Sequence, residues 1–210
     1  MSRRSQKAPT KDRNDSASQF VAFRDFLLPE ELNGVLEHVL GRKRAFRRTR
    51  IITRGNRGRV DSRYRRSREL ADLGEFGHVF THRIRSYLPW VVQRLGIPPF
   101  LVRKTIARVT ASNDGDFFKK HTDLCKGRVI TFVYYFYRKP KRFAGGELRL
   151  YRTSLDNGRP VAADSFDTVM PLQNHIVFFP SFLVHEVRRV RCRSGAIEDS
   201  RFAVTGWICK

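Results

Sequence analysis

Hydrophobic residues follow different periods in different parts of the chain, and the changes of period predict its organisation. Residues 1–18 are polar and charged and contain almost no large apolar side chains, so we expect a disordered basic tail. Apolar residues over 20–26 predict a first strand. A helix is expected from Pro29 to about Gly41, because proline suits a first helical turn and glycine a helix end. Its apolar residues recur at helical spacing, at Leu32, Val35, Leu36, Val39 and Leu40.

A second helical region is expected to follow the first. Residues 70–73 and 76–92 look helical, and the longer stretch carries an apolar stripe. Pro89 is expected to break this stretch, because an internal proline removes a backbone hydrogen bond. Residues 90–95 would then form a short separate helix that ends at Gly96.

After two consecutive prolines the period changes from helical to strand-like. Short segments rich in β-branched and aromatic residues, separated by turn residues, predict strands, with residues 154–163 as a loop. This order favours an α+β, mainly β fold, a β-sandwich or jelly roll with helices packed outside. We expect one domain over 19–210, with a helical part over about 19–99 and a β core over about 100–210. The strands are expected at 101–110, 129–137, 147–151, 168–170, 176–179, 184–190 and 202–208.

The charge of the chain is strongly positive. Its 210 residues include 42 Lys and Arg against 20 Asp and Glu, a formal net charge of +22. Such a field favours polyanions, acidic proteins or acidic metabolites, although a solvated surface without a partner accounts for it equally well. Much of the charge lies between Arg42 and Arg68, where only Asp61 opposes thirteen Lys or Arg. These are Arg42, Lys43, Arg44, Arg47, Arg48, Arg50, Arg54, Arg57, Arg59, Arg63, Arg65, Arg66 and Arg68.

The basic segment Arg42–Arg68 has two interpretations that its location distinguishes. It is either a lid or electrostatic dock for an acidic or polyanionic partner, or a solvated loop. A position at the mouth of a β-barrel permits closure over a substrate, whereas a position at the closed end permits only a remote dock or a bland surface.

Cysteine usage and hydropathy favour a cytoplasmic protein. Cys125, Cys192 and Cys209 form no paired framework and are expected to be reduced thiols. The first residues lack the apolar stretch of a secretory signal, and no apolar run approaches the length of a membrane-spanning helix, so no membrane partner is expected.

Candidate metal chemistry centres on a His-x-Asp triplet, His121 and Asp123. Residues two apart on a strand point to the same face, so this imidazole and this carboxylate can reach a common point. His185, flanked by apolar residues, is the best candidate for a third ligand. Two histidines and one carboxylate with open positions are typical of non-haem iron sites, whereas the plainer interpretation of the triplet is a hydrogen-bonded polar pair. His78 and His82 lack the glutamate of a metalloprotease helix and are interpreted as surface histidines.

A second candidate is Arg201, at the start of an otherwise apolar last strand. A buried charge is costly without a partner, and a guanidinium binds a carboxylate through two hydrogen bonds. Thr205 is four residues on and faces the same side. The alternative is an ordinary salt bridge within the chain.

Together these residues resemble the iron(II)- and 2-oxoglutarate-dependent dioxygenases, in their prolyl 4-hydroxylase-like branch. The resemblance covers roughly 107–208, about half the chain. It is carried by the order of residues 113–123, 128–135, Gly145-Gly146-Glu147-Leu148, 178–181, His185-Glu186-Val187 and 201–207.

The resemblance implies a double-stranded β-helix, a cupin-like jelly roll with iron near its mouth. His121, Asp123 and His185 would bind Fe(II), and Arg201 would bind the distal carboxylate of 2-oxoglutarate. The resemblance also implies O2 as co-substrate and ascorbate as reductant. The other implied co-substrate contacts are Tyr135, Thr205 and Leu148. Because Arg201 follows the last histidine later than is usual in the family, the nearer rivals are Arg188, Arg189, Arg191 and Arg193.

By this resemblance the chain would hydroxylate a C–H bond of a protein residue, proline among them, or of a small amino-acid-like molecule, with release of succinate and CO2. One alternative is a nucleic-acid demethylase of the same superfamily, but those enzymes carry a second arginine where this chain has Trp207. Another is a non-catalytic jelly-roll binding module, which the presence of all three candidate ligands disfavours.

Overall fold

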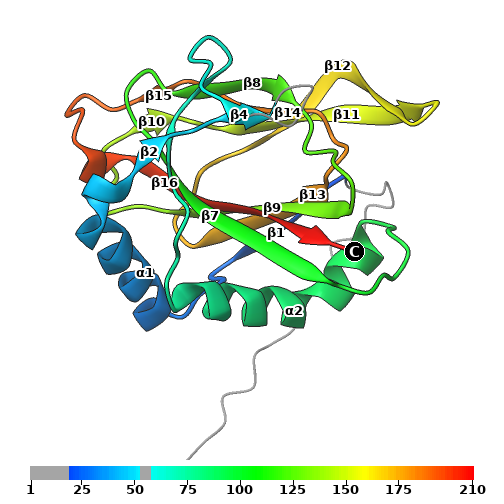
Figure 1. The fold of residues 1–210 in the computed structure, drawn as a ribbon, viewed down its shortest axis with the longest axis horizontal. Coiled ribbons are helices and arrows are strands. Elements are labelled where there is room, and N and C mark those ends of the chain that lie inside the picture. The colour runs from blue at the N-terminus through cyan, green and yellow to red at the C-terminus, as the bar shows by residue number, and fades with distance from the viewer. Residues whose placement is uncertain (1–18, 53–57) are drawn as a thin grey trace, which may run out of the picture.

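Two antiparallel β-sheets face each other, and two helices cover the outer face of the larger sheet (Figure 1). The computed structural model describes residues 19–52 and 58–210, so the expected tail at 1–18 lies outside the described residues. The helices are α1 (Pro29–Gly41) and α2 (Phe76–Arg94). Short 3-10 turns form η1 (Lys43–Ala45) and η2 (Ile197–Asp199).

The strands divide into a larger sheet, a smaller sheet and two short pairs. The larger sheet contains, in spatial order, β1 (Val21–Arg24), β13 (His175–Pro180), β9 (Arg128–Phe136), β16 (Arg201–Cys209), β7 (Lys104–Ser112), β6 (Arg68–Leu70) and β2 (Arg47–Arg48). The smaller sheet contains β12 (Arg159–Val169), β11 (Leu148–Asp156), β14 (His185–Val187), β8 (Phe117–His121) and β5 (Arg65–Arg66). The pairs are β10 (Ala144–Gly145) with β15 (Val190–Arg191), and β3 (Ile51–Ile52) with β4 (Gly58–Arg59).

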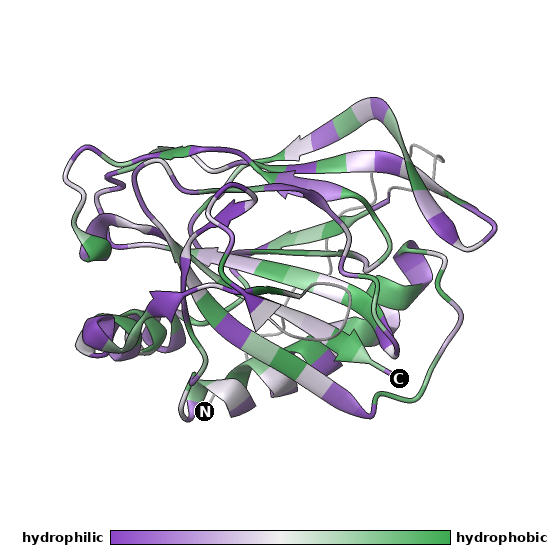
Figure 2. Cartoon of the chain, turned by 45° about the horizontal axis from the view of Figure 1, so that its top comes forward, coloured by the Kyte–Doolittle hydropathy of each residue, from purple (hydrophilic) through white to green (hydrophobic). Residues whose placement is uncertain are grey.

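Side chains of the central strand β9 point alternately to its two faces and so contribute to two separate hydrophobic cores. Phe132, Tyr134 and Phe136 point toward the helices, whereas Val133 and Tyr135 point into the space between the sheets. Hydrophobic and hydrophilic residues alternate along several strands (Figure 2), as expected for strands with two different environments. The prediction of a mainly β jelly roll with helices outside is therefore confirmed. Neither helix in the described ranges combines the length and hydropathy needed to cross a bilayer.

The predicted helix break at Pro89 is wrong. One helix, α2, runs through this residue to Arg94, and Gly96 then adopts a left-handed conformation with φ +62°. Phe80, Ile84 and Val91 lie on both sides of the proline and are all buried against the larger sheet. The burial of this continuous apolar face offsets the hydrogen bond that Pro89 removes.

Two further local predictions are also wrong. Leu70 does not begin a helix but ends β6, where it pairs with Val109 and is buried. The expected loop at 154–163 is instead the tip of a hairpin between β11 and β12. Its turn is Asn157-Gly158, and both residues have positive φ, the requirement that Asn-Gly meets most readily in a two-residue hairpin.

Gly206 should be intolerant of any side chain. A Cβ at this position in β16 would meet the Ile106 carbonyl oxygen and the Phe132 ring. Gly206→Ala should therefore lower the free energy of unfolding by about 1–3 kcal/mol in urea denaturation. Gly41→Ala is the control, because its Cβ would meet nothing within 4 Å. Equal stability of the two variants would contradict the close packing of β16 between β7 and β9.

Candidate iron and co-substrate site

The space between the two sheets opens into one cavity of about 740 Å³. Strands of both sheets and the basic segment Arg42–Arg68 contribute to its lining. His121, Asp123 and His185 line it, as do Arg201, Thr205 and Leu148, which are the other sequence-predicted site residues except Tyr135. Residues from distant parts of the sequence therefore line one cavity.

The three candidate metal ligands converge because β8 and β14 are neighbours. Their register sets His121 opposite His185, and Asp123 lies two residues beyond the end of β8. One potential ligand atom from each residue lies within 4.8 Å of the other two, and His185 Nε2 is 3.5 Å from Asp123 Oδ2. Two imidazoles and one carboxylate at this separation form a donor set that suits a divalent first-row metal such as iron.

Backbone contacts leave the same nitrogen of each histidine available for a metal. His121 Nδ1 donates to the Lys119 carbonyl at 2.8 Å, and His185 Nδ1 donates to the Leu183 carbonyl at 2.9 Å. Both Nε2 atoms are then unprotonated in the neutral rings and can act as ligands. This second layer of hydrogen bonds also fixes how the rings are turned.

Asp123 is held by β9 and by the turn after β13. The Thr131 hydroxyl donates to Asp123 Oδ2 at 3.0 Å, and the Asp123 amide donates to the Ser181 carbonyl at 2.9 Å. Burial raises the pKa of this carboxyl, but His185 and His121 outweigh it with the help of nearby hydrogen-bond donors, and the pKa lies below its usual value. The carboxylate is therefore in the ionised form that binds a metal.

His121 lies among aromatic rings. Its ring stacks on Phe118 with centroids 3.5 Å apart and lies 4.1 Å from the His185 ring. Burial is the main cause that lowers the pKa of His121 well below its usual value, and His185 adds to it. A neutral imidazole is the form that a metal binds.

Arg201 is buried deep between the sheets with unsatisfied hydrogen-bonding groups. Its side chain is 2% exposed, and neither Nε nor Nη2 has a hydrogen-bond partner within the described chain. The guanidinium lies 4.8 Å from the centre of the Tyr135 ring, and the Tyr135 hydroxyl is also buried without a partner. Orphaned donors of this kind fit a bound carboxylate, because a guanidinium left unpaired in a protein interior is costly.

The remaining predicted co-substrate residues line the same cavity as this arginine. Leu148 is buried on β11 and packs in the same apolar cluster as Tyr135. Thr205 lines the cavity from β16, four residues after Arg201. The arrangement fits a dicarboxylate that extends from the three metal ligands toward Arg201, with apolar contact along its methylene groups.

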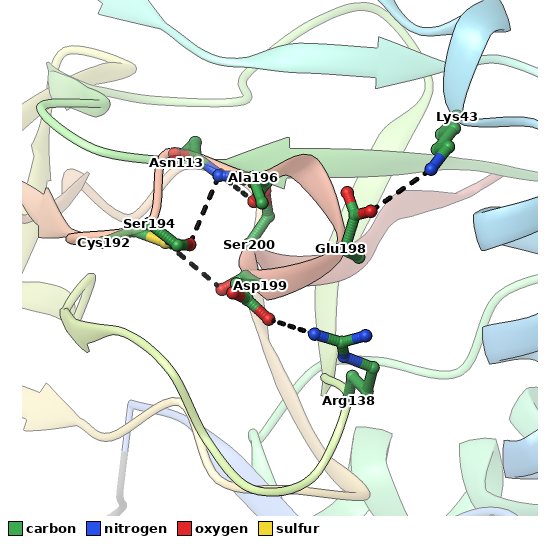
Figure 3. A network of polar contacts seen from close by, with 9 residues as sticks. All are labelled: Lys43, Asn113, Arg138, Cys192, Ser194, Ala196, Glu198, Asp199 and Ser200. Carbon is green, nitrogen blue, oxygen red and sulfur yellow. Dashed lines mark hydrogen bonds and ion pairs between the residues drawn. The ribbon is translucent and has the colours of Figure 1, made fainter.

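The long loop before Arg201 is tied down on several sides (Figure 3). Asn113 donates through Nδ2 to the Ala196 carbonyl at 2.8 Å and to Ser200 Oγ at 2.7 Å. Arg138 forms an ion pair with Asp199 at 2.7 Å. These contacts hold η2 against β7, so the extra residues between His185 and Arg201 do not loosen the start of β16.

The rival arginines do not line the cavity. Arg188 Nη1 lies 3.6 Å from Glu186 Oε1, and Arg189 Nη1 donates to the Gly115 carbonyl at 2.7 Å. Arg191 and Arg193 are exposed. Since Arg201 alone of these five lines the cavity, the geometry favours it as the carboxylate-binding residue.

The basic segment lies at the mouth of the cavity. Arg50, Arg59, Arg65 and Arg66 line it, and β5 pairs with β8, the strand that carries His121. This position permits closure over a substrate, whereas a role of the segment as lid or dock stays a prediction. Arg54, Gly55 and Arg57, in the middle of this segment, lie outside the described residues.

Sequence reasoning missed several residues of the site. Thr131 precedes Val133 and Tyr135 at a spacing of two, so alternation along β9 could have placed its hydroxyl between the sheets. Tyr64 donates to the Lys120 carbonyl at 2.6 Å, and Phe118 stacks on a ligand. Only the packing of the segment around β5 against β8 reveals the Tyr64 contact, whereas Phe118 and His121 belong to the same strand.

The chain resembles known proteins in sequence. Residues 105–209 match the family model of the 2OG-Fe(II) oxygenase superfamily. An uncharacterized PKHD-type hydroxylase from Synechocystis is 36% identical over 193 residues, a match that covers 89% of this chain. The chain spans 62% of the length of that curated relative.

Solved structures share the fold. A prolyl-4-hydroxylase from Pseudomonas putida superposes with a TM-score of 0.64 at 17% identity, over 91% of this chain and 92% of that chain. A second solved structure is a prolyl hydroxylase from Trichoplax adhaerens in complex with a peptide fragment of the hypoxia inducible factor oxygen degradation domain. It superposes with a TM-score of 0.64 at 20% identity, over 91% of this chain and 83% of that chain. At these identities the likeness shows the fold.

Removal of the Thr131 hydroxyl should weaken metal binding. Thr131→Val preserves shape but removes the hydrogen bond to Asp123, so the affinity for Fe(II) or Mn(II) should fall about ten- to hundred-fold in a chelator competition. Thr110→Val is the control, because this buried threonine lines the same cavity but donates to the Ala203 carbonyl. Equal losses in both variants would show that Thr131 does not act through the metal ligand.

Proposed function

We propose that this chain, which belongs to the 2OG-Fe(II) oxygenase superfamily, is an iron(II)- and 2-oxoglutarate-dependent dioxygenase that hydroxylates a residue of a protein, with proline as the first candidate. The observation that carries the proposal is the shared cavity. It holds two histidines and one carboxylate that converge, and a buried arginine whose hydrogen-bond donors lack partners. A structural polar pair would need no such orphaned cation nearby.

In this proposal His121, Asp123 and His185 would hold Fe(II), and three protein ligands would leave positions for further ligands. Arg201 binds the distal carboxylate of 2-oxoglutarate, with Thr205 as a further hydrogen-bonding group. Iron, 2-oxoglutarate and O2 together supply oxidative decarboxylation to succinate and CO2 and the oxidising power for the hydroxylation. The chain contributes the orientation of the ligands, the dry walls around them and a cavity that directs a substrate C–H bond to the open side.

The choice of a protein residue as substrate is supported by the relatives. The curated relative is named a PKHD-type hydroxylase, and one structural neighbour holds a peptide. The cavity is also open at its basic mouth, where an extended peptide could enter. These observations favour a peptide over a small free amino acid.

Asp123→Ala tests the proposed function. Loss of the carboxylate should abolish succinate release and hydroxylation, since the remaining histidines cannot orient iron and co-substrate. The measurement is succinate formation from 2-oxoglutarate under air with Fe(II), with and without a prolyl peptide library. His78→Ala is the control, because this exposed histidine lies on α2 outside the site. Succinate release at the parent rate by Asp123→Ala would overturn the proposal.

Arg201 should bind the co-substrate at a cost to the stability of the apo-protein. Arg201→Met should weaken 2-oxoglutarate binding by about 3–5 kcal/mol, the scale for breaking a buried pair. The same change should leave the unfolding free energy of the apo-protein unchanged or higher, because it removes a buried guanidinium with orphaned donors. Calorimetric titration under argon and urea denaturation measure the two quantities.

Arg193→Met is the matched control, because this exposed arginine lies in the loop before Arg201. Its co-substrate affinity should equal that of the parent. If Arg201→Met destabilised the apo-protein and left the affinity for 2-oxoglutarate intact, Arg201 would be part of an ordinary structural contact.

A further inference from the structure

Arg65 is a cation beside the candidate metal ligands that the proposed function does not use. It lies on β5 and lines the cavity. Its guanidinium carbon is 4.5 Å from the centre of the Phe118 ring, and Phe118 in turn stacks on His121 at 3.5 Å. The three side chains form a layered stack that ends at the metal site, so a group bound by Arg65 lies next to the reacting centre.

The guanidinium of Arg65 is oriented but not neutralised. Its Nε donates to Ser67 Oγ at 3.1 Å, while its two terminal nitrogens make no hydrogen bond within the described chain. No carboxylate of the described residues lies within ion-pair distance of it. The pKa of Arg65 is lowered chiefly by burial, although Glu69 and Asp123 act in the opposite direction. With its Nε held by Ser67, the guanidinium keeps two terminal nitrogens that can donate to a carboxylate in the cavity.

The acidic residues near the mouth of the cavity are already paired. Glu69 Oε2 lies 3.4 Å from Arg108 Nη1, and Asp61 Oδ2 lies 3.3 Å from Arg59 Nη2. Further arginines line the cavity without an ion pair to any described residue, namely Arg50 and Arg128. The entrance therefore keeps an excess of positive charge, which attracts an anionic ligand and selects against a basic one.

We propose that Arg65 recognises a carboxylate of the substrate, and that the substrate is an acidic peptide segment with a Glu or Asp close to the hydroxylated residue. This inference rests on the proposed function and names the substrate class for the same cavity. Arg65 acts as a specificity-determining residue, and the other unpaired arginines at the mouth hold further acidic side chains of the peptide.

The aromatic rings of the cavity favour a peptide over a nucleic acid. Proteins bind single-stranded nucleic acids by stacking bases on free aromatic faces. Here Phe118 is covered by His121 and by Arg65, and Arg128 lies 3.7 Å from the centre of the Trp207 ring. With these faces occupied by the protein's own side chains, the positive charge is left to bind carboxylates.

Arg65 and Arg201 serve different carboxylates in this scheme. Arg201 contacts Tyr135 in the apolar interior, whereas Arg65 contacts Phe118 and Ser67 on the strand pair at the mouth. Loss of Arg65 should therefore raise the KM for the peptide and leave the affinity for 2-oxoglutarate unchanged. Loss of Arg201 should weaken 2-oxoglutarate binding and leave the affinity for the peptide unchanged.

The experiment compares three acetylated nonapeptides with a central proline flanked by Glu, by Gln or by Lys. Binding is measured under argon with Fe(II) and 2-oxoglutarate, by competition with a fluorescein-labelled Glu peptide. We expect the Glu peptide to bind at least about ten-fold more tightly than the Gln peptide, the scale of a charge-assisted hydrogen bond. Arg65→Gln should remove this preference, and Arg65→Lys should restore part of it. Arg63→Gln is the matched control, because this arginine is exposed in the same segment and does not line the cavity.

Separate measurements distinguish failure of this inference from failure of the proposed function. Succinate release without peptide reports the oxygenase activity alone, and the argon binding assay does not depend on turnover. Equal binding of the three peptides, or equal behaviour of Arg65→Gln and Arg63→Gln, would overturn the inference. So would a weaker affinity for 2-oxoglutarate in Arg65→Gln. A 16-nucleotide oligo(dT) that displaced the Glu peptide and bound more tightly would assign the mouth to nucleic acid instead.

Discussion

The pairing of β8 with β14 is the constraint on which the rest of the site depends. It sets His121 opposite His185 and directs both rings into the space between the sheets. Because side chains alternate along a strand, a slip of one residue would turn one of these histidines outward. The register is held on both sides, since β14 also pairs with β11 and β8 also pairs with β5. The metal site is thus a consequence of sheet order, which the smaller sheet stabilises through several neighbouring strands.

Polar groups without partners distinguish the interior between the sheets from the core under the helices. Asn174 shows how the outer core satisfies its polar atoms, since its amide side chain bonds both the nitrogen and the oxygen of Leu27 and accepts from Tyr134. In contrast, Arg201 and Tyr135 keep orphaned donors in a fully buried position. Burial without hydrogen bonds costs free energy, so this part of the fold is stable only because the surrounding strands over-determine it. A ligand that satisfies these groups would add to the stability of the folded state.

The basic segment is held in place by strand pairing in spite of its charge. Arg68 pairs with Ala111 on β7, and Arg65 pairs with Phe118 on β8, so one short stretch bridges the two sheets at the mouth of the cavity. Attractive contacts between arginines and aromatic rings, such as Arg65 over Phe118, offset part of the repulsion among like charges. The segment thus combines a defined backbone with cations that keep unused hydrogen-bonding capacity.

The local pattern of residues along the sequence was enough to predict many of the elements and the candidate metal ligands. The helix at Pro29–Gly41, the five strands β1, β7, β9, β13 and β16 of the larger sheet and the candidate ligands His121, Asp123 and His185 follow from periodicity and residue chemistry, which act over a few neighbouring residues. Contacts between distant residues decided the remainder. The continuous helix through Pro89 and the strand at Leu70 both depend on burial against the larger sheet. The positions of Thr131, Tyr64 and Arg65 around the metal ligands likewise depend on which strands become neighbours. No local property of the sequence carries that information, because the free energy that selects those neighbours comes from surface buried between segments far apart in the chain.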